Sequence, residues 1–297
     1  MNSAGDEPHV DPAHMAEIVE NRARMLRESA ALEVEPVSRV VDLDADGVPC
    51  RLFVPAGDVP FTLVYAHGGG FAFGEVGTHD PTMRAVANAT GCALLFIDYR
   101  RSPEHRFPAA VDDVQRATAW WRDHASDNGL SPDRLVAFGD SAGANLALGL
   151  VRRHPDWFVG QVLIYPFIDA RCATYDRGLV DADLPISDCE FFWSLYAPNG
   201  SAYDDVDFDP LLAAGYSGLP PTLIQLAELD VLTPTGRLLA GRMEADGVAV
   251  RTLVYRGVPH GFWRRSSAYP QSRQAVGDLV EWIDERRSFP ALCRGSR

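Results

Sequence analysis

The chain has 297 residues, 46% of them hydrophobic, which is enough to bury the core of one α/β domain with an insertion or of two small domains. It carries 41 acidic against 27 basic residues, and the resulting net charge of −14 argues against nucleic acid and anionic membrane surfaces as partners. Residues 1–12 lack the features of a secretory signal and no apolar run is long enough to span a membrane, so we expect a cytoplasmic protein.

The cysteines are odd in number and lack the spacing of a metal site, which favours free thiols and predicts no bound metal or other cofactor. They are Cys50, Cys92, Cys172, Cys189 and Cys293.

The first half of the chain alternates predicted helices and strands. Apolar residues at helical spacing predict an amphipathic helix over 11–31, and Asp46-Gly47 is the expected turn of a hairpin formed by 38–43 and 50–54. Short, continuously apolar runs follow, which are typical of strands covered on both faces. These strands are expected at 61–66, 92–98, 135–138 and 161–165, and the helices between them at 81–90, 109–125 and 144–153.

After Pro166 the alternation stops. Residues 169–217 have helical patches but no strand pattern, and a long inserted segment over an α/β sheet is often a lid. The alternation then resumes, with strands at 222–227 and 250–255 and helices at 235–245 and 271–286. We therefore expect an α/β fold with a central, mostly parallel eight-stranded sheet and flanking helices.

Ser141 stands where a predicted strand turns directly into a predicted helix, in the sequence Gly139-Asp140-Ser141-Ala142-Gly143. A strand that turns at once into a helix crowds its own backbone, so small residues are needed on either side of the turn. A serine at such a turn is exposed at a helix N-terminus, where free N–H groups favour negative charge. The motif alone also fits a purely structural strand-to-helix turn.

A nucleophilic serine needs a base and a group that orients the base. Asp230 follows the predicted strand 222–227, and His260 follows the strand 250–255, so the order is Ser141, Asp230, His260, as expected for an α/β-hydrolase. Glu228 competes with Asp230 for the acidic role. The other candidate bases precede Ser141 in the chain, against the order of the fold, and are His67, His79 and His105.

A glycine run, His67-Gly68-Gly69-Gly70-Phe71, directly follows the strand 61–66. Glycines at the end of a strand let backbone N–H groups approach a ligand closely. A flexible turn and a phosphate loop are alternatives, but the run lacks the features of either phosphate motif. We predict that the N–H groups of Gly69, Gly70 and Ala142 form an oxyanion hole.

Together these motifs resemble the bacterial hormone-sensitive-lipase-like carboxylesterases (family IV) of the α/β-hydrolase superfamily. The resemblance covers about residues 54–282, and its further matches are Asp98-Tyr99-Arg100, Pro103-Glu104-His105, Tyr165-Pro166 and His260-Gly261-Phe262. It departs from the family at Val231-Leu232-Thr233-Pro234, at Arg101-Ser102 and at Ala144, and none of these positions is the proposed nucleophile or base.

The resemblance implies a metal-independent esterase that acts on small-molecule, short-to-medium acyl esters through an acyl-enzyme. It also implies a two-part helical cap, and a homodimer through pairing of the last strand. The expected organisation is a cap helix region over 1–36, a hydrolase core over 37–168 and 218–297, and an inserted cap over 169–217. Alternatives are a deacylase, amidase or acyl-transfer enzyme of a biosynthetic pathway, and a non-catalytic receptor on the same scaffold.

The substrate pocket is expected to be lined by aromatic side chains near these motifs or in the insertion, namely Phe71, Phe191, Phe192 and Phe262, from a wider set that includes Phe73, Trp193 and Trp263. Arg264 and Arg265 follow closely. They can pair a substrate carboxylate, but a solvated surface pair is the favoured interpretation.

Overall fold

The computed structural model describes residues 11–180 and 182–288. Its strands are β1 (Arg39–Asp44), β2 (Pro49–Val54), β3 (Thr62–Ala66), β4 (Ala93–Ile97), β5 (Leu135–Asp140), β6 (Phe158–Ile164), β7 (Thr222–Leu229) and β8 (Val250–Pro259). Its α-helices are α1 (Pro12–Ala30), α2 (Val76–Thr90), α3 (Ala109–His124), α4 (Ala142–Arg153), α5 (Ile186–Tyr196), α6 (Thr233–Ala245) and α7 (Pro270–Asp284).

The strands form one eight-stranded sheet in the order β1-β2-β4-β3-β5-β6-β7-β8 within the described residues. β1 pairs antiparallel with β2, and β2 pairs antiparallel with β4. The other neighbours are parallel. The hairpin and the mostly parallel sheet predicted from the sequence are therefore confirmed, and the fold is that of an α/β hydrolase.

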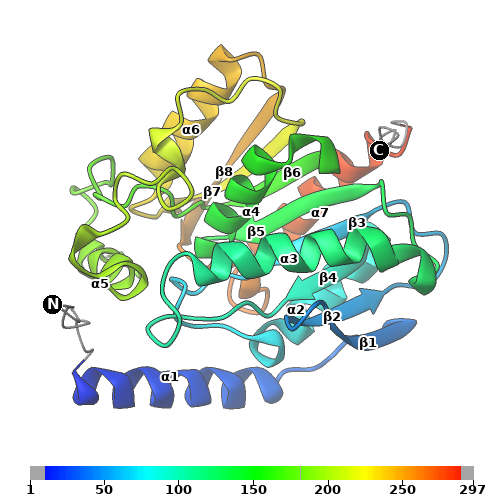
Figure 1. Ribbon diagram of the computed structural model, residues 1–297, viewed down its shortest axis with the longest axis horizontal. Helices are drawn as coiled ribbons and strands as arrows, with labels where there is room; N and C mark the ends of the chain where they lie inside the picture. Colours follow the sequence, from blue (N-terminus) through cyan, green and yellow to red (C-terminus); the bar gives the residue numbers. More distant parts are fainter. Residues whose placement is uncertain (1–10, 181, 289–297) are drawn as a thin grey trace, which may run out of the picture.

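Helices cover both faces of the sheet. Figure 1 shows α3 and α4 in front of the strands and α7 behind them. Alternate residues along one strand belong to different cores, as the two-residue period of a strand requires. Val64 packs into the core beneath α3, α4 and α6, while Leu63 and Tyr65 pack into the core beneath α2 and α7.

α2 begins five residues before the predicted start at Pro81. Proline is favoured in the first turn of a helix, which made Pro81 the expected start. Instead, the helix begins at Val76, because the Thr78 side chain caps its first turn. The Thr78 hydroxyl accepts a hydrogen bond from the Glu75 N–H at 2.9 Å and donates one to the Glu75 carbonyl at 2.8 Å.

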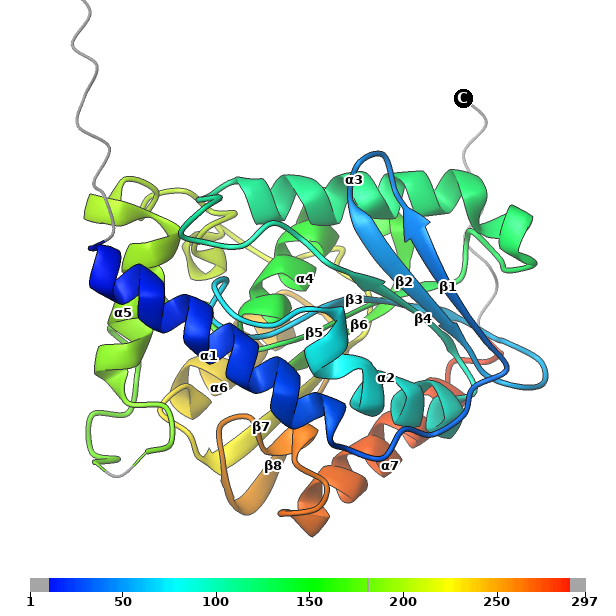
Figure 2. The ribbon, with the colours of Figure 1, turned by 90° about the horizontal axis from the view of Figure 1, so that it is seen from below.

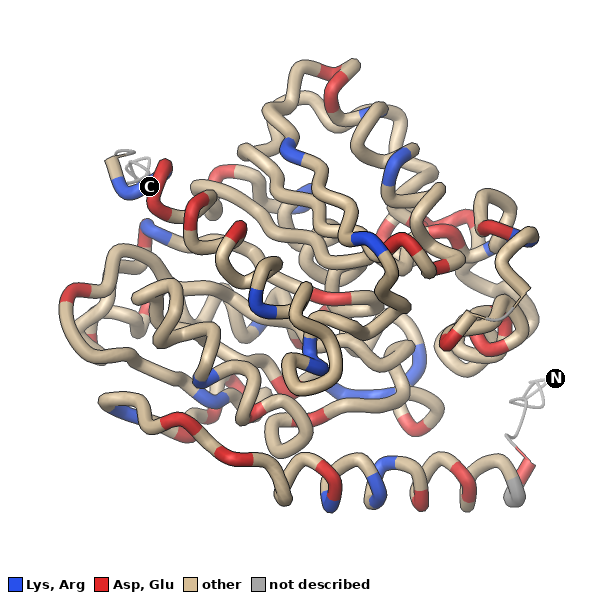
Figure 3. The backbone as a smooth tube through the Cα atoms, turned by 180° about the vertical axis from the view of Figure 1, so that it is seen from behind, with Lys and Arg blue, Asp and Glu red and all other residues tan. Residues whose placement is uncertain are grey.

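α1 and α5 lie together over the glycine run. Figure 2 shows α5 beside the N-terminal half of α1. Ile18 of α1 and Leu195 of α5 are buried in one small cluster with Ala72, against which Phe191 and Phe192 pack. Acidic and basic residues both occur along α1 (Figure 3), and most of them are exposed, so the charged side of this amphipathic helix faces solvent.

Arg22 anchors α1 to the loops that contain Ala72 and Ser102. Its Nε donates to the Ala72 carbonyl at 2.8 Å, one terminal nitrogen donates to the Ser102 carbonyl at 2.7 Å, and the guanidinium also pairs with Glu104 at 2.6 Å. Arg24, two residues on, instead makes an exposed pair with Glu28 at 3.2 Å.

We expect Arg22→Ala to lower the free energy of unfolding by about 2 kcal/mol, because it removes hydrogen bonds that involve a charged donor. Hydrogen–deuterium exchange should become faster along α1. Arg24→Ala is the matched control and should change stability by less than about 0.5 kcal/mol, since exposed ion pairs contribute little. Equal effects of the two substitutions would contradict the anchoring role of Arg22.

Candidate active site

Ser141 occupies a strained turn between β5 and α4. It is the residue before the first turn of α4, and its backbone φ of +53° is one that residues other than glycine rarely adopt. The backbone around it is crowded, because a Cβ on Gly143 would stand 2.0 Å from the Ala66 carbonyl oxygen. A Cβ on Gly139 would stand 2.3 Å from the Gly143 carbonyl oxygen. Both glycines are therefore required by the turn that places Ser141, which is itself 7% exposed, between β5 and α4.

Two hydrogen bonds connect Ser141, His260 and Asp230. His260 Nδ1 lies 2.7 Å from Asp230 Oδ2, and its Nε2 lies 3.0 Å from Ser141 Oγ. An ionised carboxylate only accepts, so Nδ1 carries the proton and Nε2 is free to accept from the serine hydroxyl. Asp230 is buried, and its other oxygen accepts the Leu232 N–H at 3.0 Å. This arrangement is chemically able to activate a hydroxyl for attack on an acyl carbon.

The competing acid and the competing bases lie elsewhere. Glu228 accepts a hydrogen bond from the Gly257 N–H at 2.8 Å. His67 is fully buried, with its ring stacked on Tyr99, and burial lowers its pKa to about 3, so it stays neutral. His79 is likewise fully buried, whereas His105 is exposed. None of these three histidines is bonded to Ser141.

The glycine run passes beside Ser141 and is fixed by Asp140. One Asp140 oxygen accepts both the Gly68 N–H at 2.7 Å and the Tyr65 hydroxyl at 2.6 Å. Gly69 and Gly70 have φ of +122° and +59°, and a Cβ on Gly70 would stand 2.4 Å from the Phe192 ring. Glycine is needed here both for conformation and for space.

A cavity of about 100 Å³ opens at Ser141, and we call it the reaction cavity. The predicted residues that line it are Gly69, Gly70, Ser141, Phe192 and His260. The lining residues that sequence reasoning missed are Asp140, Tyr165, Phe167, Leu184 and Gly261. Arg264, for which the sequence favoured a surface position, also lines the cavity. Tyr165 and Phe167 directly follow β6, so the rule that located Asp230, the carboxyl end of a parallel strand, also points to them.

Three predicted pocket aromatics do not line the reaction cavity. Phe71 is fully buried with its ring stacked on Tyr196 at 3.8 Å, and Phe262 is fully buried in the core on the opposite face of the sheet. Phe191 packs toward α1, because neighbouring residues of a helix point about 100° apart. Of the four predicted residues, Phe192 alone is in the lining.

The surface-pair interpretation is wrong for Arg264. Its side chain is only 24% exposed, and its Nε lies 3.5 Å from the buried Asp140 Oδ2. Arg265 follows the prediction, because it is exposed and pairs with Asp183 at 2.9 Å.

The described residues contain no group of three or more His, Cys, Asp and Glu side chains arranged to hold a metal ion. Among the same residues, no helix is both long and apolar enough to cross a membrane. The four cysteines in these ranges, Cys50, Cys92, Cys172 and Cys189, are free and buried, while Cys293 lies outside them.

Known proteins are similar to this chain in sequence and in fold. Residues 63–264 match a family model described as an alpha/beta hydrolase fold. The ethyl acetate hydrolase of Pseudomonas putida is 33% identical, with 92% of each chain covered. The carboxylesterase NlhH of Mycobacterium tuberculosis is 32% identical, with 88% of this chain and 86% of that protein covered.

Among solved structures, the thermostable carboxylesterase EstE1, cloned from a metagenomic library, superimposes with a TM-score of 0.82 at 32% identity. The match covers 91% of this chain and 97% of that one. The family model, the curated relatives and this structure agree with the motifs and the sheet described above. The chain therefore belongs to the α/β-hydrolase family, among its hormone-sensitive-lipase-like carboxylic ester hydrolases.

Proposed function

We propose that the protein is a serine carboxylesterase that hydrolyses short-to-medium acyl esters through an acyl-enzyme intermediate. The observation that carries this proposal is the pair of hydrogen bonds that joins Asp230 to His260 and His260 to Ser141. In the reaction, His260 takes the proton of Ser141 as the hydroxyl attacks the ester carbon and returns that proton to the leaving alcohol. Asp230 holds the imidazole in the required tautomer.

The N–H groups of Gly69, Gly70 and Ala142 stabilise the oxyanion that forms in the attack. Ala142 is the first residue of α4, where N–H groups have no partner within the helix. One such donor typically contributes about 3 kcal/mol to transition-state stabilisation. Phe192, which lies on Gly70, covers the glycine run and borders the substrate.

The reaction cavity is small, with a volume of about 100 Å³, which favours small esters. The name of the Pseudomonas putida relative, ethyl acetate hydrolase, agrees with a small substrate. None of the relatives named above is a deacylase, an amidase or an acyltransferase.

The predicted division into a core and a two-part cap is also part of this proposal. The cluster of Ile18, Ala72 and Leu195 supports it, because it joins α1 and α5 above the glycine run. A cytoplasmic location and a homodimer formed through β8, an edge strand of the described sheet, stay predictions.

A fluorophosphonate probe tests the proposed nucleophile. We expect it to label one residue per chain, to place the label on Ser141 by peptide mass spectrometry, and to abolish hydrolysis of p-nitrophenyl acetate and butyrate in proportion to labelling. With these esters, a burst of p-nitrophenol equal to the enzyme concentration is the expected kinetic sign of the acyl-enzyme. Full activity in the labelled protein would contradict the proposal.

A further inference from the structure

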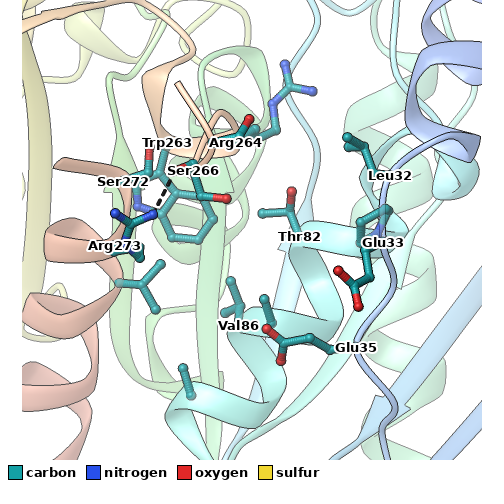
Figure 4. Close-up of a pocket in the computed structure, with 15 residues that line it drawn as sticks. Leu32, Glu33, Glu35, Thr82, Val86, Trp263, Arg264, Ser266, Ser272 and Arg273 are labelled. Carbon is teal, nitrogen blue, oxygen red and sulfur yellow. Dashed lines mark hydrogen bonds between the residues drawn. The ribbon is translucent and has the colours of Figure 1, made fainter. Parts of the chain in front are cut away.

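A second, larger cavity adjoins the reaction cavity. It has a volume of about 550 Å³ and lies between α2, the chain that follows α1, and the segment from Trp263 to α7. We call it the side cavity. Its lining shares one residue, Arg264, with the lining of the reaction cavity among the described residues. Figure 4 shows the Arg264 side chain along one end of the side cavity, with its guanidinium turned away from Val86 and Glu35.

Arg264 is held in this wall mainly by charge. Asp140 Oδ2 lies 3.5 Å from Arg264 Nε, which is too long for a good hydrogen bond. Neither of these two buried atoms has a hydrogen-bond partner in the described structure. Arg264 also interacts with the Tyr165 side chain beside it. Asp140 is meanwhile bonded through its other oxygen to Gly68 and Tyr65. The side chain of Arg264 is thus held in this wall by its charge, next to the buried Asp140.

The alcohol part of the ester is expected next to the wall formed by Arg264. His260 must reach the leaving oxygen in order to protonate it, so the alcohol part of the ester lies next to His260. Gly261 and Arg264, which line the reaction cavity there, belong to the segment that directly follows His260.

The side cavity can accept an alkyl chain. Val86 and Trp263 are buried side chains in its lining, and Val276 is a further apolar one. The charged residues Glu33, Glu35 and Arg273 are exposed at its rim. A buried apolar floor with a polar rim suits an alkyl group better than a charged one.

We propose that Arg264 is a specificity-determining residue that closes the reaction cavity toward the side cavity and so limits the alcohol part of the ester to small groups. When the Arg264 side chain is shortened, the side cavity accordingly becomes a binding site for n-alkyl alcohol chains of about four to eight carbons. Each methylene buried there adds favourable transfer free energy. This inference rests on the proposed esterase function.

The test measures kcat/KM for acetate esters of ethanol, butanol, hexanol and octanol. For Arg264→Ala we expect the ratio of hexyl to ethyl acetate to rise at least tenfold over the unmodified protein, since access of several methylenes to an apolar pocket has effects of this order. Arg264→Met removes the charge but keeps a long side chain, so its ratio should stay within about threefold of the original. Arg265→Ala, an exposed neighbour outside both linings, is the control and should leave the ratio unchanged.

A second substitution tests where the longer chain lies. Ala85 lines the side cavity on α2, so Ala85→Phe should cancel the gain of Arg264→Ala while having little effect in the unmodified protein. A parallel series of p-nitrophenyl esters, from acetate to octanoate, varies the acyl part and should show no comparable gain.

Three results would overturn the proposal: equal ratios in the alanine and methionine variants, a gain confined to the acyl series, or a gain that survives Ala85→Phe. If Arg264→Ala does not fold because Asp140 loses its cation, Asp140→Asn combined with Arg264→Ala removes that buried charge, and the same ratios are measured there. Failure of the proposed function is distinguishable, because the unmodified protein would then neither hydrolyse ethyl acetate nor react with the fluorophosphonate at Ser141.

Discussion

Ser141→Ala is expected to lower kcat for p-nitrophenyl butyrate by about 10⁶-fold, because the attacking oxygen is removed and only binding and oxyanion stabilisation remain. His260→Ala should lower kcat by a similar factor, since its Nε2, 3.0 Å from Ser141 Oγ, is the group that takes the proton. Asp230→Asn should cost about 10⁴-fold, because an amide in this position favours the wrong tautomer of the imidazole.

The double variant Ser141→Ala with His260→Ala should be no slower than either single variant, because residues that act as a unit are not additive. His105→Ala is the control, since His105 is exposed and is not bonded to Ser141. Initial rates with circular dichroism of each variant provide the measurement. A loss of less than about tenfold in a folded Ser141→Ala protein would exclude Ser141 as the nucleophile.

Gly143→Ala is expected to destabilise the fold by about 3 kcal/mol, at the upper end of the usual cost of overpacking. The added methyl would stand 2.0 Å from the Ala66 carbonyl oxygen and 2.7 Å from the His67 carbonyl carbon. These atoms belong to the backbone at the end of β3, so no side chain can move aside. The glycine run that follows Ala66 would be displaced, and esterase activity should fall with stability.

Gly149, in the same helix, provides the matched control. A Cβ there meets no atom within 4 Å, so Gly149→Ala should stabilise α4 by about 0.5–1 kcal/mol, through the better helix propensity of alanine. Urea denaturation of both variants measures the free energies of unfolding. Equal stability of the two variants would show that the turn at Ser141 can accommodate a methyl group at position 143, and would contradict the crowding described here.

The errors in placing side chains from the sequence share one cause. Phe71 and Phe262 adjoin the two motifs closest to Ser141 and were therefore expected in the pocket, yet their rings lie in the cores on opposite faces of the sheet. Proximity in sequence does not fix the direction of a side chain where the chain leaves a strand. The surface position expected for Arg264 is wrong for a related reason. The sequence shows that the residue is charged, but not the direction of its side chain or the cavity that this side chain lines.

The sequence by itself determined the order of strands and helices along the chain, the turn at Ser141 and the strand ends at which Asp230 and His260 stand, because periodicity, glycine placement and strand ends are local properties of the chain. The structure then showed that Asp230 rather than Glu228 pairs with His260. Tertiary structure alone decided which aromatic residue borders Ser141, how Asp140 fixes the glycine run, and that Arg264 lines two cavities. These features depend on contacts between segments more than 70 residues apart, from Gly68 to Asp140 and from Asp140 to Arg264. Local pattern cannot determine such contacts, because they arise only when the whole sheet brings its carboxyl ends together.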